Sequence, residues 1–78
     1  MVDVHLIERL NRMADACAAN PGHRSVLSTG ERLAVALILD RSDWLAEWQY
    51  TMLQAIERVG ADWMTAVRQA ANIRDRVR

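Results

Sequence analysis

The stretch LSTGERLAVALILD, residues 27–40, decides the fold that we expect for the chain. Ser28 and Glu31 form an S-x-x-E capping box, which is a typical start signal for a helix. The run that follows, LAVALIL at residues 33–39, is apolar on nearly every side, so its helix should be the central and most buried element. A buried strand is the other interpretation of such a run, because Val and Ile favour strands. The capping box and the lack of a partner strand elsewhere favour the helix.

An amphipathic helix is expected before this central segment, over about residues 3–19. Its apolar positions recur at spacings of four, three and four, as one face of a helix requires. They are Leu6, Leu10, Met13 and Cys17. Pro21 and Gly22 stop the helix, because proline cannot continue it and glycine permits a turn. Residues 23–31 are then expected to form a connecting loop.

Three further helical segments are expected after the central helix, the first a short one over about residues 43–48. The second begins at a T-x-x-Q capping pattern at Thr51 and stops at Gly60. Its inner stripe is predicted to contain Met52, Leu53, Ile56 and Val59. The last helix spans about residues 63–77, and its predicted inner face contains Trp63, Met64, Val67, Ala70 or Ala71, and Ile73. The tail over residues 74–78 is expected to fray.

The expected fold class is therefore all-α: a compact bundle of three to four helices around the buried central helix. A chain of 78 residues holds one hydrophobic core, so residues 1–78 are predicted to form a single helical domain. The longest apolar run is far shorter than the ~20 residues that span a bilayer. The N-terminus lacks the basic region of a signal peptide, and the single Cys17 is typical of a reducing compartment. We therefore expect a cytoplasmic protein without a membrane segment.

Charge is balanced, with 10 basic and 10 acidic residues, and every basic residue is an arginine. Zero net charge argues against a general nucleic-acid binder, which normally has a basic excess, and equally against an acidic mimic of DNA. Arginine is well suited to interfaces, because its planar guanidinium makes paired contacts that lysine does not.

No motif for catalysis, metal binding or cofactor binding is present in the sequence. The spacing of His5, Cys17 and His23 matches no zinc pattern, and Cys17 lies on an apolar stripe where a cysteine is normally a small buried hydrophobe. The three glycines form no phosphate-binding loop. Asp40 and Asp43 are expected to cap helix ends. The sequence therefore predicts a protein that is not an enzyme and needs no cofactor.

The segment DWLAEWQY, residues 43–50, concentrates three of the chain's aromatic residues: Trp44, Trp48 and Tyr50. Trp44 and Trp48 are four residues apart and share a helix face. Two interpretations stay open: the tryptophans close the edge of the core, or they form a surface that grips a protein partner. In the second interpretation Arg41, Arg58 and Arg68 would surround the patch.

A helix-turn-helix regulator is the alternative prediction. Residues 51–69 contain two helices joined at Gly60, which is the broad form of that motif. Its second helix would offer four outward polar groups to DNA, namely Thr65, Arg68, Gln69 and Asn72. A homodimer that pairs through an exposed patch is a third possibility.

Four features between Leu27 and Met64 carry a resemblance: the STGE cap, the LAVALIL run, the DWLAE segment and the ERVGADW helix junction. They resemble small proteins carried by prophages and mobile elements of GC-rich bacteria. The resemblance implies an accessory protein, a class that includes anti-CRISPR inhibitors, which bind and block host nuclease complexes. Such inhibitors share no common sequence signature, so no site residues carry over. The leading prediction is a non-enzymatic protein-binding module that occludes a surface of a host complex.

Overall fold

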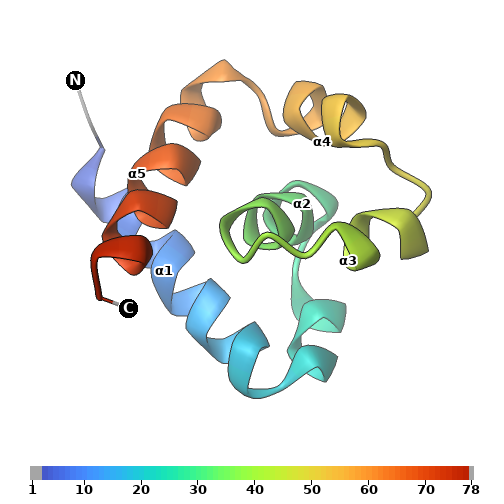
Figure 1. The fold of residues 1–78 in the computed structure, drawn as a ribbon, viewed down its shortest axis with the longest axis horizontal. Helices are drawn as coiled ribbons and strands as arrows, with labels where there is room; N and C mark the ends of the chain where they lie inside the picture. Colours follow the sequence, from blue (N-terminus) through green and yellow to red (C-terminus); the bar gives the residue numbers. More distant parts are fainter. Residues whose placement is uncertain (1–2, 78) are drawn as a thin grey trace.

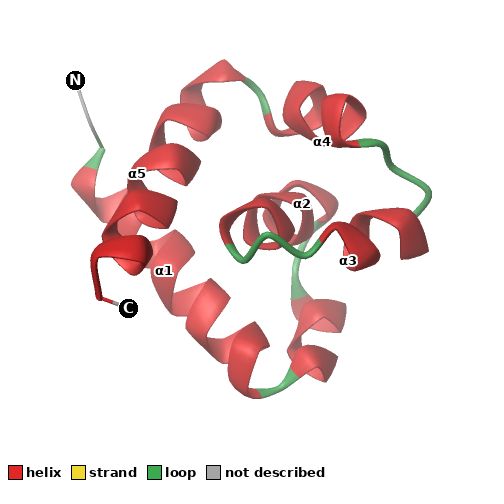
Figure 2. Ribbon diagram, viewed as in Figure 1, coloured by secondary structure: helices red, strands yellow, loops and turns green. Residues whose placement is uncertain are grey.

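Every regular element between residues 3 and 77, the part of the chain that this computed structural model describes, is a helix (Figure 2). The elements in chain order are α1 (Val4–Ala19), the 3-10 helix η1 (Pro21–Val26), α2 (Thr29–Ile38), α3 (Ser42–Glu47), α4 (Met52–Val59) and α5 (Ala61–Val77). The all-α prediction is confirmed. Of the six helices among the described residues, four have seven or more residues. The short α3 lies where a short helix was expected, whereas η1 was not predicted and extends into the expected loop over residues 23–31.

Helix α2 lies in the middle of the fold, between the α1–α5 pair and the α3–α4 pair (Figure 1). Its buried side chains are Leu33, Ala34, Val35, Ala36 and Ile38. The predicted capping box is formed: the Glu31 N–H donates to Ser28 Oγ at 3.3 Å, and the Ser28 N–H donates to Glu31 Oε1 at 2.8 Å. The capping box therefore starts α2 at the predicted residue, and the apolar run makes it the central helix that the other four α-helices surround.

The capping box predicts a specific dependence of stability on pH. The backbone N–H of Ser28, and to a lesser degree Arg9, hold the pKa of Glu31 below its ordinary value of 4.5. A depressed folded-state pKa stabilises the fold above that ordinary value, and the stabilisation is lost as pH falls through the folded-state pKa. Glu31→Gln removes the charge and keeps the box, since glutamine also suits this position. The free energy of unfolding of the wild type should exceed that of the variant at pH 7.

Urea titrations at pH 7 and at steps down to pH 3 would check this. The difference between wild type and variant should narrow as the pH falls below 4.5 and through the folded-state pKa of Glu31, because protonation makes both side chains neutral. A difference that stays constant across the range would show that the charge of Glu31 contributes nothing.

Helix α1 packs against α2 and α5, and Asp3 caps its start by accepting a hydrogen bond from the Leu6 N–H at 3.1 Å. Its fully packed positions are Ile7, Leu10, Ala14 and Cys17. Two members of the predicted stripe, Leu10 and Cys17, are buried, whereas Leu6 and Met13 are only partly covered. Burial raises the pKa of the Cys17 thiol, against the weaker opposing effect of the Arg24 charge. The predicted reading of Cys17 as a small buried hydrophobe is confirmed.

Helix α4 begins and ends as predicted, but the face that it packs against the core is not the predicted one. The Thr51–Gln54 capping box is present, and Gly60 ends the helix with a φ of 91°, a conformation that glycine adopts without steric cost. The predicted inner stripe is wrong for Met52 and Leu53, which are 46% and 71% exposed, whereas Val59 packs against the core as predicted. The buried residue of α4 is Ala55. A small side chain at the contact lets α4 approach its neighbours closely, which turns the larger apolar residues toward solvent.

Helix α5 starts directly after Gly60, two residues earlier than predicted, and buries Ala66, Val67 and Ala70. Ile73, expected on the inner face, is 46% exposed. Residues 74–77, in the tail predicted to fray, have helical geometry, and Arg78 lies outside the described residues. Among the helices described, none combines the length and the apolarity needed to cross a membrane.

Candidate protein-binding surface

Trp44 belongs to the core. Its side chain is 3% exposed, and the adjacent Leu45 is 2% exposed, so the short α3 buries both. The Cζ atoms of Arg24 and Arg41 lie 4.5 and 4.4 Å from the centroid of the Trp44 ring, within the range of cation–π attraction. Of the two interpretations of the tryptophans, the structure assigns Trp44 to the core. Trp44 is therefore removed from the set of side chains that could contact a partner.

Trp48 and Tyr50 are half-buried and pack against the edge of the core. The Trp48 ring lies 6.4 Å from the Trp44 ring, tilted by 49°, which is a normal packing geometry for two aromatic rings. The Cζ atoms of Arg24 and Arg32 lie 5.6 and 5.9 Å from the Trp48 ring centroid. Each aromatic side chain therefore has one part fixed by the core and another part reachable from solvent.

Two large apolar side chains follow on the first turn of α4. Met52 is 46% exposed and Leu53 is 71% exposed. Together with Trp48 and Tyr50 they place four large apolar residues on six consecutive positions at the surface. We call these four residues the α3–α4 surface.

A shallow groove between α4 and α5 adds further apolar area. Its volume is about 590 Å³, and its lining residues are Ile56, Glu57, Gly60, Ala61, Met64, Thr65 and Arg68. Ile56 and Met64 are partly exposed in it. Of the four α4 residues predicted for the inner stripe, Ile56 lines this groove.

The arginines predicted to surround the patch differ in their partners. Arg41 is exposed and donates two hydrogen bonds to Asp43, at 3.0 and 2.9 Å, which hold the pKa of that carboxyl below its usual value. Arg58 and Arg68 are exposed and have no ion pair with the described residues. Arg58 and Arg68 therefore keep guanidinium groups available for an external carboxylate.

The residues predicted to bind DNA all lie on the outer side of α5. Thr65, Arg68, Gln69 and Asn72 are exposed, and their spacing of three, one and three places them on one helix face. At the start of the same helix, Trp63 and Met64 are partly buried and pack against the core. The second helix of the predicted motif thus presents polar groups, with its bulky start directed partly inward.

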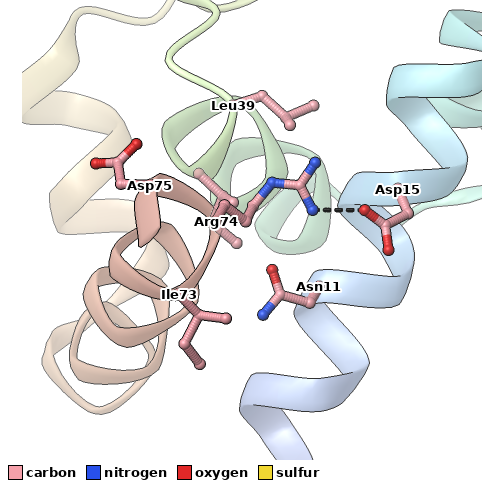
Figure 3. A pocket seen from close by; sticks show the side chains of 7 residues that line it. Asn11, Asp15, Leu39, Ile73, Arg74 and Asp75 are labelled. Atoms are coloured by element: carbon pink, nitrogen blue, oxygen red, sulfur yellow. Dashed lines mark hydrogen bonds and ion pairs between the residues drawn. The ribbon is translucent and has the colours of Figure 1, made fainter. Parts of the chain in front are cut away.

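A separate pocket of about 490 Å³ lies between α1 and α5. It is lined by Asn11, Asp15, Ile38, Leu39, Ile73, Arg74 and Asp75. In Figure 3 the Arg74 side chain reaches from α5 to Asp15 on α1, and the two groups are 2.5 Å apart. The Asn11 Oδ1 atom is buried there without a hydrogen-bond partner among the described residues. Because Arg74 and Asp15 neutralise each other within the protein, we do not place the partner surface at this pocket.

Of the three residues considered for metal or catalytic chemistry, two lie on α1 and one lies on η1. His5 is exposed on α1, Cys17 is fully buried on the same helix, and His23 lies on η1. Within residues 3–77 no three His, Cys, Asp or Glu side chains form a group that could hold a metal ion.

Sequence reasoning missed Arg24, Arg32, Met52 and Leu53 as surface candidates. The two arginines lie 24 and 16 positions before Trp48, so only the tertiary fold brings them to its ring. Met52 and Leu53 carried a helical pattern that indicated burial. No protein-family model, curated protein or solved structure matches this chain.

Proposed function

We propose that the protein is a non-enzymatic protein-binding module, an inhibitor of the anti-CRISPR type carried by phages and mobile elements. Its mechanism is steric: it occludes a surface of a host nuclease complex. The observation that carries the proposal is the exposure of Met52 and Leu53 beside the half-buried Trp48 and Tyr50. The phage setting comes from the sequence resemblance over Leu27 to Met64.

The composition of the α3–α4 surface supports a protein partner. Tryptophan, tyrosine and methionine are enriched at the centres of protein interfaces, and contiguous exposed apolar residues often mark an interaction site. The core edge fixes Trp48 and Tyr50 before binding, so little side-chain entropy is lost on association. Arg58 on α4 and Arg68 beside the groove add charged groups suited to the rim of an interface.

The test starts with capture of the partner from the native host by the tagged protein and its identification by mass spectrometry. The purified partner is then titrated with wild type, Leu53→Glu and Val26→Glu. Val26 on η1 is also 71% exposed and is not one of the four residues of the α3–α4 surface, so it is a matched control. We expect Leu53→Glu to weaken the complex about 10- to 30-fold, because it places a charge in an apolar interface. Val26→Glu should bind as the wild type does.

Equal affinities for all three proteins would rule out the α3–α4 surface as the contact. Sedimentation velocity on the isolated wild-type protein tests whether it self-associates through the same surface. A mass twice that of the chain, reduced to one chain by Leu53→Glu, would identify a homodimer instead.

DNA binding is the second candidate, favoured by the exposed polar face of α5. Thr65, Arg68, Gln69 and Asn72 present donors and acceptors that suit base edges and phosphates. A gel-shift titration with duplex DNA across salt concentrations decides it. Binding that weakens steeply with salt and is lost in Arg68→Ala would support a DNA-binding regulator. The absence of any gel shift at low salt would exclude DNA binding.

A further inference from the structure

A small pocket of about 270 Å³ lies between α2 and the segment that leads from α3 to α4. It is lined by Thr29, Arg32, Leu33, Trp48 and Tyr50. Sites for whole small molecules usually measure about 300–1,000 Å³, so this pocket is just below that range and has room for a side chain of a partner. Leu33 and the two aromatic rings supply its apolar wall.

Arg32 is the charged member of the lining, and it is held in place. Its Nε donates to the Leu27 carbonyl oxygen at 3.2 Å, and its Cζ lies 5.9 Å from the centroid of the Trp48 ring. The side chain is partly buried, yet the described residues give it no ion pair. Its terminal N–H groups are therefore positioned but have no carboxylate to bind.

The nearby acidic groups are already paired with other arginines. Glu31 pairs with Arg9, and Glu47 pairs with Arg24 at 3.1 Å. The charged residues around Trp44 and Trp48 comprise three arginines and two acids, so three positive charges face two negative ones. They are Arg24, Arg32, Arg41, Asp43 and Glu47. The pocket therefore has a local positive charge, although the whole chain is neutral.

We propose that this pocket binds a carboxylate of the partner protein, presented by a glutamate side chain. Arg32 pairs with the carboxylate, Leu33 and Trp48 cover the methylene stem, and the hydroxyl groups of Thr29 and Tyr50 supply further donors. The ion pair forms at a partly desolvated guanidinium that has no internal partner, so it adds more than a pair at a fully exposed site. The assignment rests on the proposed binding function for the identity of the partner, but its chemistry can be tested without that partner.

The probes are N-acetyl-glutamate amide and N-acetyl-glutamine amide, which have the same shape and differ in the side-chain charge. Nuclear magnetic resonance titrations of the full chain follow the Arg32 Nε–H, the Trp48 indole N–H and the backbone amide of Tyr50. A ligand of this size binds with about 4 kcal/mol, so a Kd of about 1 mM is expected for the glutamate probe. The glutamine probe should bind at least about fivefold more weakly, because it lacks the charge.

Two variants complete the test. Arg32→Gln should abolish saturable shifts with the glutamate probe, and Arg12→Gln, at an exposed arginine of α1, should leave them unchanged. Equal binding of the two probes, or no saturable shift up to about 20 mM, would overturn the proposal. The comparison of the probes on the wild type decides the matter even if Arg32→Gln fails to fold.

The outcome is separable from that of the proposed function. If the glutamate probe does not bind more tightly than the glutamine probe while Leu53→Glu weakens the captured complex, the pocket assignment is wrong and the proposed protein-binding function is supported. If the glutamate probe binds more tightly than the glutamine probe while Leu53→Glu leaves the affinity for the partner unchanged, the pocket binds carboxylates and the proposed α3–α4 interface is wrong.

Discussion

Replacing Trp44 with alanine is expected to lower the free energy of unfolding by about 3–5 kcal/mol, because a buried tryptophan leaves a large cavity when it is truncated. The ring is 3% exposed and joins the core with the neighbouring Leu45. Arg24 and Arg41 also lose the ring that their guanidinium groups approach within 4.5 Å. A domain of this size has little stability to spare, so the variant should be largely unfolded at 37 °C.

Urea denaturation followed by far-ultraviolet circular dichroism measures this effect without relying on tryptophan fluorescence. Trp44→Phe is the matched control, because it keeps an aromatic face for the two arginines and loses less volume. Its destabilisation should be clearly smaller than that of Trp44→Ala. A loss below about 1 kcal/mol for Trp44→Ala would mean that the ring contributes no more than a surface side chain.

Replacing Ala55 with glutamate is expected to destabilise the fold by about 3–5 kcal/mol, because it places an unpaired charge at a fully buried position. Ala55 is 0% exposed, on the side of α4 that joins the core. The matched variant is Leu53→Glu, two residues earlier on the same helix, where the side chain is 71% exposed. Its effect on the free energy of unfolding should stay within about 0.5 kcal/mol.

Comparing Ala55→Glu with Leu53→Glu shows which face of α4 is turned toward the core. Thermal and urea unfolding of both variants supply the two free energies. A larger loss for Leu53→Glu than for Ala55→Glu would place the predicted apolar stripe inside the protein after all.

The helix boundaries could be predicted well because their causes are local. The capping boxes at Ser28 and Thr51 are made by hydrogen bonds between residues three apart, and Gly60 stops α4 through its own backbone conformation. A sequence displays such signals directly. The buried apolar run of α2 is equally plain, since it leaves no polar face to turn outward.

The orientation of α4 could not be predicted, because Ala55 sits within the same helical pattern as the larger Met52 and Leu53. Hydrophobicity favours burying the larger side chains, whereas close packing of helices favours the small one at the contact. The three-dimensional fit decides between them. The candidate pocket was hidden for a related reason: Arg32 and Trp48 are 16 positions apart and meet only when α3 folds back on α2.

The packing of α1 against α5 has a consequence for how the chain folds during synthesis. Helix α1 is covered on one side by α5, which is synthesised later, so the apolar face of α1 is incomplete until translation has passed α5. Contacts between distant parts of a chain form slowly, and exposed apolar surface invites aggregation in the interval. We therefore expect the nascent chain to become resistant to proteases in one late step, after α5 leaves the ribosome, rather than helix by helix.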